Sequence, residues 1–556
     1  MRTMAYSFYR FIGVLSISIV FLFISCSRQN DNNDKVIIGI PADAETINPL
    51  YSFSVNEANI NELLFLSLIK HYWNHEKGDI ESEPMLAKGW NWNDDSLSIT
   101  LDLRDDVEWT DGNKCTVDDV VFSFDLYSDP EVQSYMYGAF ENFYTDNNNH
   151  VLINKTFEIL SPYKLVIKFK PGSNPSLFNI DFPILPKHVF EKIDRKAINN
   201  SQINSNPVTN GPFKLSKWER NQYIVLEKNP KSYLTKSETV NELVFKVVPE
   251  YNSRLNQLKN SEIDLMESIK TDDIDDLKKV ESITLKNVKG RTYDYIGWSN
   301  IDRDQYNSSK KIKTNNMFGS RKVRIALTHA IHRDEILKSY LKNNGSICVG
   351  PVSPIFKNAI NTSIQPYEYN PVLAKKILEE EGWKDSNHDG TLDKGSKEFE
   401  FTLTIPSGNP RRSYAATVIK QNLSEIGISV NIESIELGTF INKLSSREMD
   451  AWMAGWIIPI PTDLGISWHS NLETTPFNYV GYQNKEVDKI LDEFKKSRSE
   501  NQKNLLLRKI QEILHNDEPA TLLYWVDNIV AFNNRINGTD INPLGVIHHC
   551  WNWTKN

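Results

Sequence analysis

The stretch from Leu97 to Ser123 constrains the fold of this chain more than any other part of its sequence. From Leu97 to Leu103 apolar residues alternate with polar ones, which is the period of a strand that buries one face. Thr110-Asp111-Gly112 predicts a turn in which Gly112 takes a positive φ. Thr116 and Asp119 follow with the T-x-x-D spacing of a capping box, which predicts a helix start. Many folds contain such a strand, turn and helix. The particular residues of the segment are therefore needed to narrow the choice of fold.

The bulk properties favour a large globular protein and exclude several classes. At 556 residues the chain is too long for one ordinary core, so two or three lobes are expected. A net charge of −9, with no basic stripe, argues against a nucleic-acid partner. The four cysteines lie far apart and form no C-x-x-C pair, so they predict neither a zinc ribbon nor a redox motif; they are Cys26, Cys115, Cys348 and Cys550. At most one disulfide is possible once Cys26 is set aside.

The first residues predict an exported protein. Arg2 and Arg10 precede the apolar run from Phe11 to Ile24, as in the charged and apolar regions of a secretory signal. The run ends at Ser25-Cys26, which resembles a bacterial lipobox and predicts lipidation of Cys26 after removal of residues 1–25; an uncleaved anchor is the alternative. Residues 26–35 are polar and unpatterned, so they are expected to form a flexible tether.

Several short sequence motifs along the chain resemble those of one protein family. Pro84-Met85-Leu86-Ala87, Trp90, L-x-L-R-x-x-V-x-W-x-D-G and T-x-D-D-V-x-F-S follow one another through Ser123. Together they resemble the signature of solute-binding protein family 5, the extracytoplasmic peptide-binding receptors of ABC importers. The resemblance continues in order through T-N-G-P-F-K-L at 209–215, R-K-V-R-I-A-L at 321–327, L-E-E-E-G-W at 378–383 and N-Y-V-G-Y at 478–482.

This resemblance implies an α/β fold of the two-lobed periplasmic-binding-protein kind, in the large class with an extra N-terminal subdomain and a ligand cleft between the lobes. The expected division gives lobe I as 36–295, with the subdomain at about 85–208, lobe II as 296–522, and a return of 523–556 to lobe I. A chain that crosses between two lobes implies a hinge, because a trapped ligand must enter while the lobes are apart.

The resemblance also nominates two charged ligand-binding residues. Arg412 matches the arginine of an "R-P-Y" phrase that holds the ligand carboxylate in dipeptide receptors, and a guanidinium suits a carboxylate because it donates two parallel hydrogen bonds. A solvated loop arginine is the alternative. The family's "W-x-x-D-x-x-D-P" stretch, whose Asp holds the ligand ammonium, here runs from Trp452 without its first Asp. Asp463 is the nearest carboxylate, and it either replaces that anchor or caps the following turn.

Three further residues are expected at the cleft. Trp452 and Trp456 share one face if they lie on a strand, and we expect them to line the cleft, although helix-core spacing is the alternative. Asn48 belongs to Ile47-Asn48-Pro49-Leu50, which resembles the "x-L-D/N-P" turn that borders the ligand in such receptors.

Metal and catalytic motifs are weak. Oxygen-bearing residues alternate as in a calcium loop at Asp385, Asn387, Asp389 and Asp393, but the twelfth position is Ser396, so a plain turn is favoured. His71 and His75 lack the H-E-x-x-H glutamate and are expected on a helix surface, while His548 and His549 are an opportunistic chelator at most. No nucleophile elbow, P-loop or dinucleotide motif is present.

The sequence therefore predicts a non-enzymatic substrate-binding lipoprotein of an ABC importer, without a cofactor. Its expected partners are an oligopeptide, the permease subunits and the membrane that holds its lipid, and it is expected to act as a monomer outside the cytoplasm. The alternatives are a receptor of the same fold for an oligosaccharide, nickel chelate or haem, and, with less support, an extracytoplasmic hydrolase.

Overall fold

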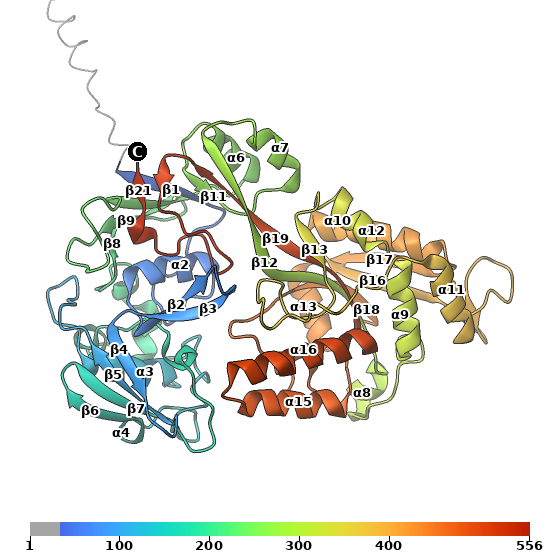
Figure 1. Ribbon diagram of the computed structural model, residues 1–556, viewed down its shortest axis with the longest axis horizontal. Helices are drawn as coiled ribbons and strands as arrows, with labels where there is room; N and C mark the ends of the chain where they lie inside the picture. The colour runs from blue at the N-terminus through green and yellow to red at the C-terminus, as the bar shows by residue number, and fades with distance from the viewer. Residues whose placement is uncertain (1–33) are drawn as a thin grey trace, which may run out of the picture.

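The computed structural model describes residues 34–556, which form two lobes joined by two long crossing strands (Figure 1). The expected signal peptide, Cys26 and most of the tether lie outside the described residues. No helix within 34–556 is long and apolar enough to cross a membrane. The mixed α/β architecture with two lobes confirms the expected fold class.

One sheet of 11 strands runs through both lobes. Its strands in spatial order are β17 (Ser429–Ile435), β16 (Glu400–Pro406), β18 (Ala451–Ile457), β12 (Ile283–Trp298), β19 (Ala520–Asn533), β11 (Leu265–Met266), β1 (Lys35–Ile40), β10 (Glu242–Val247), β9 (Tyr223–Lys228) and β8 (Phe213–Glu219), with β13 (Gly345–Ile347) beside β19. We call the part from β11 to β8 lobe I and the part from β17 to β18 lobe II.

The strands β12 and β19 carry the chain between the lobes. They pair antiparallel from Ile283 opposite Asn533 to Gly297 opposite Ala520, with irregularities between Val288 and Thr292 and between Asp294 and Tyr295. The division expected at residues 295 and 296 falls inside β12, and the one expected at 522 and 523 falls inside β19. The two lobes are thus joined by one pair of continuous strands.

Lobe I carries an additional sheet of four strands in the order β4 (Ala87–Trp92), β5 (Ser98–Leu103), β7 (Lys164–Lys168) and β6 (Phe157–Ser161). β5 is the strand predicted from alternation. The helix α3 (Val117–Ser128) begins as predicted, because Thr116 and Asp119 form the capping box, with the Thr116 amide donating to Asp119 Oδ2 at 2.9 Å. Gly112 has φ +93°, as expected for the turn.

Short hairpins and helices complete the molecule. The hairpins are β2 (Ile69–Asn74) with β3 (Asp79–Pro84), β14 (Asp393–Lys394) with β15 (Lys397–Glu398), and β20 (Ile536–Asn537) with β21 (Thr554–Lys555). Beside α3, lobe I contains α2 (Val55–Leu64), α4 (Ile153–Thr156), α5 (Lys187–Phe190), α6 (Tyr251–Lys259) and α7 (Ile274–Leu277). Lobe II contains α8 (Arg303–Ser309), α9 (Arg321–Ala330), α10 (Arg333–Ser339), α11 (Pro371–Glu380), α12 (Pro410–Ser424), α13 (Leu437–Ser445), α14 (Gly465–Trp468), α15 (Lys485–Lys496) and α16 (Glu500–Asp517).

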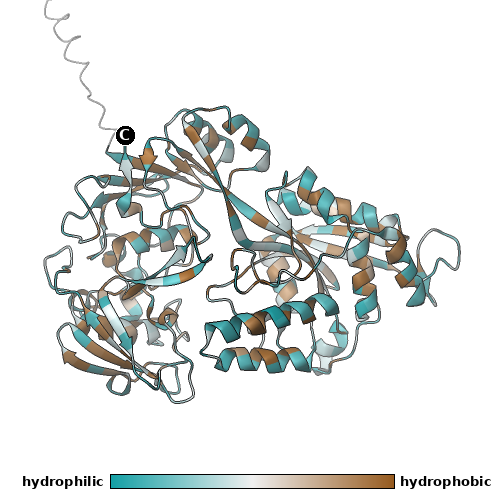
Figure 2. Cartoon of the chain, viewed as in Figure 1, coloured by the Kyte–Doolittle hydropathy of each residue, from teal (hydrophilic) through white to brown (hydrophobic). Residues whose placement is uncertain are grey.

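The lobe II sheet is covered on both faces. Residues of α9 and α12 pack with Ile296 and Met453 in one core, whereas residues of α15 and α16 pack with Tyr295 and Trp452 in another. Figure 2 shows teal and brown turns alternating along α15 and α16, the pattern of helices that bury one face. Strand neighbours in this part of the sheet therefore point into different cores.

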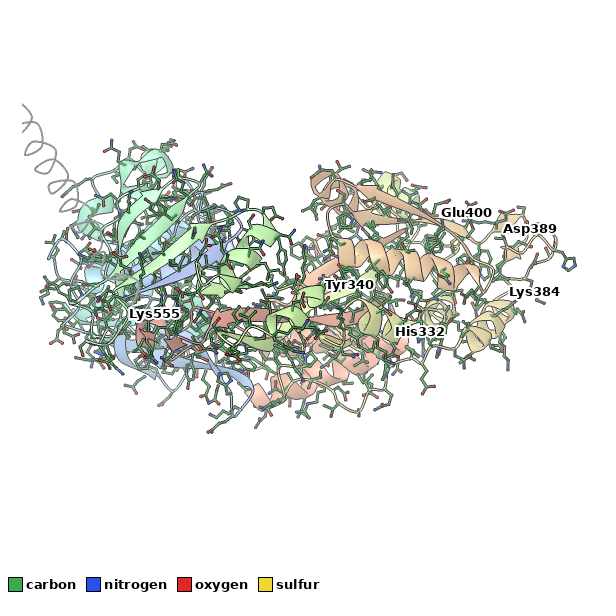
Figure 3. The ribbon with its side chains drawn as sticks, turned by 90° about the horizontal axis from the view of Figure 1, so that it is seen from above. His332, Tyr340, Lys384, Asp389, Glu400 and Lys555 are labelled. Atoms are coloured by element: carbon green, nitrogen blue, oxygen red, sulfur yellow. The ribbon has the colours of Figure 1, made fainter. Side chains whose placement is uncertain are left out.

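The end of the chain is fastened to lobe I. Asp264 is fully buried and receives hydrogen bonds from Arg535 Nε at 2.6 Å and Lys555 Nζ at 2.9 Å. In the view of Figure 3, Lys555 lies in the opposite lobe from His332 and Asp389. These contacts join the C-terminal segment to Asp264, which precedes β11. Of the four cysteines, Cys115, Cys348 and Cys550 are buried free thiols.

Candidate functional site

The central feature of the site is a carboxylate held between two arginines at the end of lobe II that β12 enters. Asp294 of β12 is fully buried. Its Oδ2 accepts from Arg411 Nε at 2.7 Å, and its Oδ1 accepts from Arg412 Nε at 3.1 Å. Both arginines belong to the first turn of α12, which begins at Pro410 after Asn409 caps it by accepting from the Arg412 amide at 3.2 Å. One acid between two permanently charged guanidinium groups leaves a net positive charge.

Gly455 of β18 makes room for this cluster. Gly455 lies directly opposite Asp294 in the antiparallel pair of β18 and β12, so both residues point to the same face of the sheet. A Cβ at position 455 would lie 2.2 Å from Arg412 Nη2 and 2.8 Å from Asp294 Oδ1. Position 455 is also where the family phrase places its first Asp. The carboxylate of this chain therefore comes from the neighbouring strand, and arginine fills the vacated volume.

Arg412 retains hydrogen-bonding capacity. Its side chain is 16% exposed, and its Nη1 and Nη2 have no acceptor among residues 34–556, since its side-chain hydrogen bond is the one from Nε to Asp294. The hydroxyl of Tyr524 is also buried near the cluster without a partner in the described chain. Burial raises the pKa of Tyr524 well above its ordinary value, and the nearby Asp294 adds to this. The cluster thus offers neutral and cationic donors to an anionic group.

The two tryptophans of β18 lie in different environments. Both point to the face opposite the arginine cluster, as expected for a strand. Trp452, however, is 2% exposed and packs in the core, where its Nε1 donates to the Tyr295 hydroxyl at 3.4 Å. The expectation that Trp452 lines the cleft is therefore wrong, because its ring packs against Gly297 of β12 in the core that α15 and α16 cover. Trp456 is partly exposed and, with Phe477 at 5.3 Å between ring centroids, lines a small aromatic recess.

Asp463 and Asn48 both make hydrogen bonds within the protein. Asp463 Oδ1 accepts from the Gly465 amide at 2.8 Å, at the start of α14. Asn48 is 3% exposed, donates to Asn204 Oδ1 at 2.8 Å and accepts from the Leu50 amide at 3.0 Å. The structure thus places Asn48 in a structural turn, and it is the neighbouring Pro49 that reaches a cavity.

That cavity has a volume of about 560 Å³ and lies against lobe I. It is lined by α2 with the residues before it, the start of β2, the segment 178–183 and the C-terminal residues Leu544 and His548. Ile460 and Pro461, from the loop after β18, complete it from the side of lobe II. Because six residues of chain span at most roughly 20 Å, the cavity lies within about that distance of Gly455.

The expectation that His71 and His75 lie on a helix surface is wrong. His71 belongs to β2 and His75 follows that strand, so neither is on a helix. His75 and His549 instead bind Asp540: His75 Nε2 lies 3.0 Å and His549 Nδ1 3.2 Å from its carboxylate, and Glu83 lies 2.7 Å from His549 Nε2. Hydrogen bonds to Asp540 and Glu83 raise the pKa of His549 to about 9, so this network fastens the C-terminal segment to β3.

The loop from Asp385 to Asp393 uses its carboxylates internally. Asp385 accepts from the amides of Asp389 and Gly390, and Asp393 accepts from the amide and hydroxyl of Ser386. Within residues 34–556, no group of three or more His, Cys, Asp or Glu side chains is arranged to hold a metal ion. The geometry is that of a turn.

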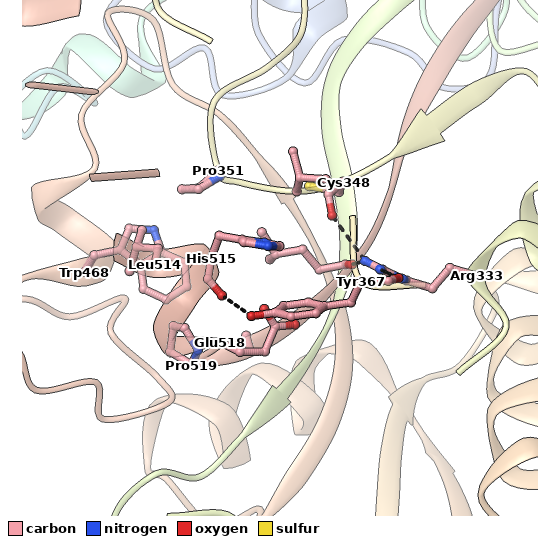
Figure 4. A pocket seen from close by; sticks show the side chains of 12 residues that line it. Arg333, Cys348, Pro351, Tyr367, Trp468, Leu514, His515, Glu518 and Pro519 are labelled. Carbon is pink, nitrogen blue, oxygen red and sulfur yellow. Dashed lines mark hydrogen bonds between the residues drawn. The ribbon is translucent and has the colours of Figure 1, made fainter. Parts of the chain in front are cut away.

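A second cavity lies inside lobe II and is only about 10 Å³ in volume (Figure 4). Its charged groups have partners within lobe II: Glu518 accepts from the hydroxyl of the neighbouring Thr328 at 2.7 Å, and Arg333 donates to the carbonyls of Leu522 at 2.9 Å and Tyr367 at 2.7 Å. A volume of this size admits about one water molecule. This cavity is therefore a structural polar network.

The sequence analysis missed Asp294, Arg411 and Gly455. One signal was present for Asp294, since it is the only charged residue in the otherwise uncharged run Tyr293-Asp294-Tyr295-Ile296-Gly297-Trp298. A carboxylate in a buried strand requires a cationic partner.

The comparisons with known proteins agree with this architecture. The family model described as "Bacterial extracellular solute-binding proteins, family 5 Middle" matches residues 81–477. The oligopeptide-binding protein AppA of Bacillus subtilis is 27% identical over 98% of this chain and 97% of its own. Its structure in complex with a nonapeptide superposes with a TM-score of 0.72 at 26% identity, covering 94% of this chain and 99% of that one. The structure of NikZ from Campylobacter jejuni in complex with Ni(L-His) gives a TM-score of 0.72 at 25% identity, covering 94% and 100%.

Proposed function

This chain belongs to the family 5 bacterial extracellular solute-binding proteins, and from that membership we propose that it captures oligopeptides between its lobes and delivers them to the membrane permease of an ABC importer. Members of this family bind solutes for transport and are not enzymes. Oligopeptide binding by AppA, a relative that matches over almost the whole chain, supports the choice of a peptide.

The observation that carries the proposal is the cluster of Asp294, Arg411 and Arg412. Its net positive charge and the unpaired Nη atoms of Arg412 suit a carboxylate, and a free peptide always carries one at its C-terminus. Asp294 fixes both guanidinium groups before the ligand arrives, which reduces the side-chain entropy lost on binding.

The connection between the lobes supports a hinged mechanism. β12 and β19 cross side by side, and the pairing is interrupted between Val288 and Thr292, where the chain passes from lobe I to lobe II. Rotation at this point would bring the arginine cluster and the lobe I wall of the 560 Å³ cavity together around a ligand.

A non-peptide solute is the second candidate, and Gly455 favours it. The residue that would bind the ligand ammonium in the family phrase is absent here, and two arginines occupy its surroundings. A solute with an anionic group but no ammonium, such as a metal chelate, fits that change. NikZ, bound to Ni(L-His), has the same fold.

The location and assembly state are parts of the same proposal. Cys26 would carry the lipid that holds the body at the membrane surface, and residues 26–35 would be the tether. The protein would act as a monomer, with the permease as its macromolecular partner.

Calorimetry with matched peptides tests the function. Stoichiometric binding of labelled oligopeptides, recovered intact, is expected, and C-terminal amidation should weaken binding by roughly 2–5 kcal/mol in the wild type but not in Arg412→Ala. Arg508, a lobe II arginine that binds the Asn358 carbonyl, offers the control Arg508→Ala, which should respond to amidation like the wild type.

Two further results decide between the candidates. Mass spectrometry of the co-purifying solute should identify peptides, and scattering curves should become more compact at saturation. Peptide turnover, an absence of peptide binding, or a co-purifying metal chelate would contradict peptide capture.

A further inference from the structure

Three hydrogen bonds join the lobes outside the crossing strands. Asn174, which follows β7 in lobe I, donates through Nδ2 to the Lys495 carbonyl at 3.0 Å and to the Ser497 carbonyl at 2.9 Å. Arg498 of lobe II donates through Nη1 to the carbonyl of Asp95, in the turn between β4 and β5, at 2.7 Å. Both donors therefore reach from one lobe to the backbone of the other.

The lobe II part of this contact is the turn that joins α15 to α16. α15 ends at Lys496, and α16 begins at Glu500. The last carbonyl groups of a helix have no partner within the helix, and the Lys495 carbonyl is one of them. Asn174 supplies a donor to it, so a side chain of lobe I caps a helix of lobe II.

The turn is attached firmly to lobe II. α15 and α16 pack through Ile490 and Leu507 in the core that also contains Trp452 of β18. In Figure 1 the two helices extend from lobe II toward the sheet that contains β4 and β5, below the crossing of β12 and β19. A hydrogen bond weakens steeply when its atoms separate or its angle changes. Rotation about the crossing strands would therefore break the three bonds.

An apolar contact joins the same two lobes. Trp73 of β2 packs edge-on against Phe356 with 6.0 Å between ring centroids, and each residue is 7% exposed. Phe356 lies in the lobe II core that α15 and α16 cover, and the Lys357 amide donates to the Gly78 carbonyl at 3.4 Å. Both partners of each contact belong to the protein. The contacts can therefore form with or without a bound solute.

We propose that Asn174 and Arg498, with the carbonyls of Lys495, Ser497 and Asp95, form a latch that holds the lobes together independently of a ligand. The latched form keeps both lobes around the 560 Å³ cavity, and it opens when the three bonds break. The consequence for transport rests on the proposed function: a solute enters and leaves while the latch is open, so the latch controls both rates.

The latch is weak enough to open. Arg498 is exposed and Asn174 is partly exposed, so water can bond to either donor when the lobes separate. A hydrogen bond that water can replace contributes a factor of roughly two to ten to an equilibrium constant. Three such bonds favour the latched form without making it permanent, and a receptor that must release its solute requires this balance.

Small-angle scattering of protein freed of co-purifying solute tests the latch. The double variant Asn174→Ala, Arg498→Ala should have a larger radius of gyration than the wild type, because its lobes separate more often. Equal radii for the two proteins would overturn the latch.

Asn307 and Arg220 supply the matched control. Asn307 donates to the Ser446 and Arg447 carbonyls at 2.9 and 3.3 Å, just after α13, and Arg220 donates to the Ala44 carbonyl at 3.0 Å. Each of these bonds stays within one lobe, so the double variant Asn307→Ala, Arg220→Ala should keep the wild-type radius. The same increase in this variant would overturn the proposal, since the loss of any surface hydrogen bond would then be sufficient.

Stopped-flow kinetics with a fluorescent peptide test the consequence for binding. Loss of the latch should accelerate both association and dissociation by roughly tenfold, because the open form is more populated and the complex opens faster. A side chain that only contacts the ligand would change mainly the dissociation rate. Faster dissociation with unchanged association would therefore overturn the latch.

The latch and the proposed function fail separately. If the wild type binds no peptide, peptide capture fails, and the scattering comparison still decides the latch because it needs no ligand. If the wild type binds peptide but its radius equals that of the Asn174→Ala, Arg498→Ala variant, capture stands and the latch fails.

Discussion

Asp294 and Gly455 face each other across the antiparallel pair of β12 and β18, and the missing side chain of one admits the arginine that binds the other. An acid on one strand and a glycine on the next thus act as a unit. The arrangement supplies a carboxylate from β12 next to position 455, where the family motif would place one on β18. It also converts the local charge from negative to positive, because Arg411 and Arg412 accompany it.

Gly455→Ala should destabilise lobe II. The new methyl would lie within 3 Å of Arg412 Nη2 and Asp294 Oδ1, and overpacking of this kind costs about 1–3 kcal/mol. Urea unfolding measures the change. Gly89→Ala is the control, since a Cβ there meets nothing within 4 Å. Equal unfolding midpoints for the two variants would show that Arg412 and Asp294 can shift to accommodate the methyl group without loss of stability.

Asp294→Ala should destabilise the protein more than the substitution of an exposed acidic residue does. It would leave two largely buried guanidinium groups without a counter-charge, a loss of about 3–5 kcal/mol. Asp118→Asn, whose side chain is 60% exposed and pairs with Lys187 at 3.7 Å, should cost less than about 1 kcal/mol. Chemical denaturation followed by tryptophan fluorescence measures both. Similar small losses would mean that Asp294 is not needed to hold the arginines.

Glu518 should make stability depend on pH. Burial raises its pKa from 4.5 to about 7, against the opposing effect of Arg333. The folded protein therefore holds this proton more tightly than the unfolded chain. The contribution is complete below pH ~4.5 and is lost as the pH rises through ~7.

Glu518→Gln should remove this pH-dependent loss of stability, because glutamine does not titrate. The unfolding free energy of the variant relative to the wild type should increase by about 2–3 kcal/mol between pH 5 and pH 8. Taking the difference cancels other titrating groups such as His515, whose pKa burial lowers to about 4. A difference that does not change with pH would mean that Glu518 stays ionised.

The three described cysteines should be protected thiols. Cys115, Cys348 and Cys550 are at most 1% exposed, and burial raises the pKa of each. Since the thiolate is the reactive form, iodoacetamide should label them slowly in the folded protein and fully in urea. Peptide mass spectrometry reads out each site, and rapid native labelling of any of them would contradict the packing.

Cys26→Ser should release the protein from the membrane or leave it unprocessed. The prediction rests on the lipobox and the polar residues after it, since Cys26 lies outside the described residues. Fractionation and N-terminal sequencing decide the matter. A variant that stays in the membrane fraction with an unchanged N-terminus would contradict lipidation.

Local elements followed from the sequence because their causes lie a few residues apart. The strand from Ser98 to Leu103 formed where polar and apolar residues alternate, and Thr116 found its capping partner three residues away. The order of family phrases along the chain likewise predicted two lobes. Such patterns act within one strand, one turn or one helix start, so the chain alone specifies them.

The functional site could not be predicted from the sequence in the same way. Trp452 and Trp456 share a face, as their spacing in a strand requires, but only their position along β18 decides that one is in the core and the other at a recess. His71 and His548 are 477 positions apart in the chain numbering and line one cavity.

The sequence by itself determined the family, the strand and helix starts and the presence of two lobes. The tertiary structure alone decided that Asp294 meets Arg412 and that Gly455 leaves space for them. The physical reason is that a charge or a lone pair has no defined role until the fold supplies its partner and excludes water, and these partners lie on different strands and helices.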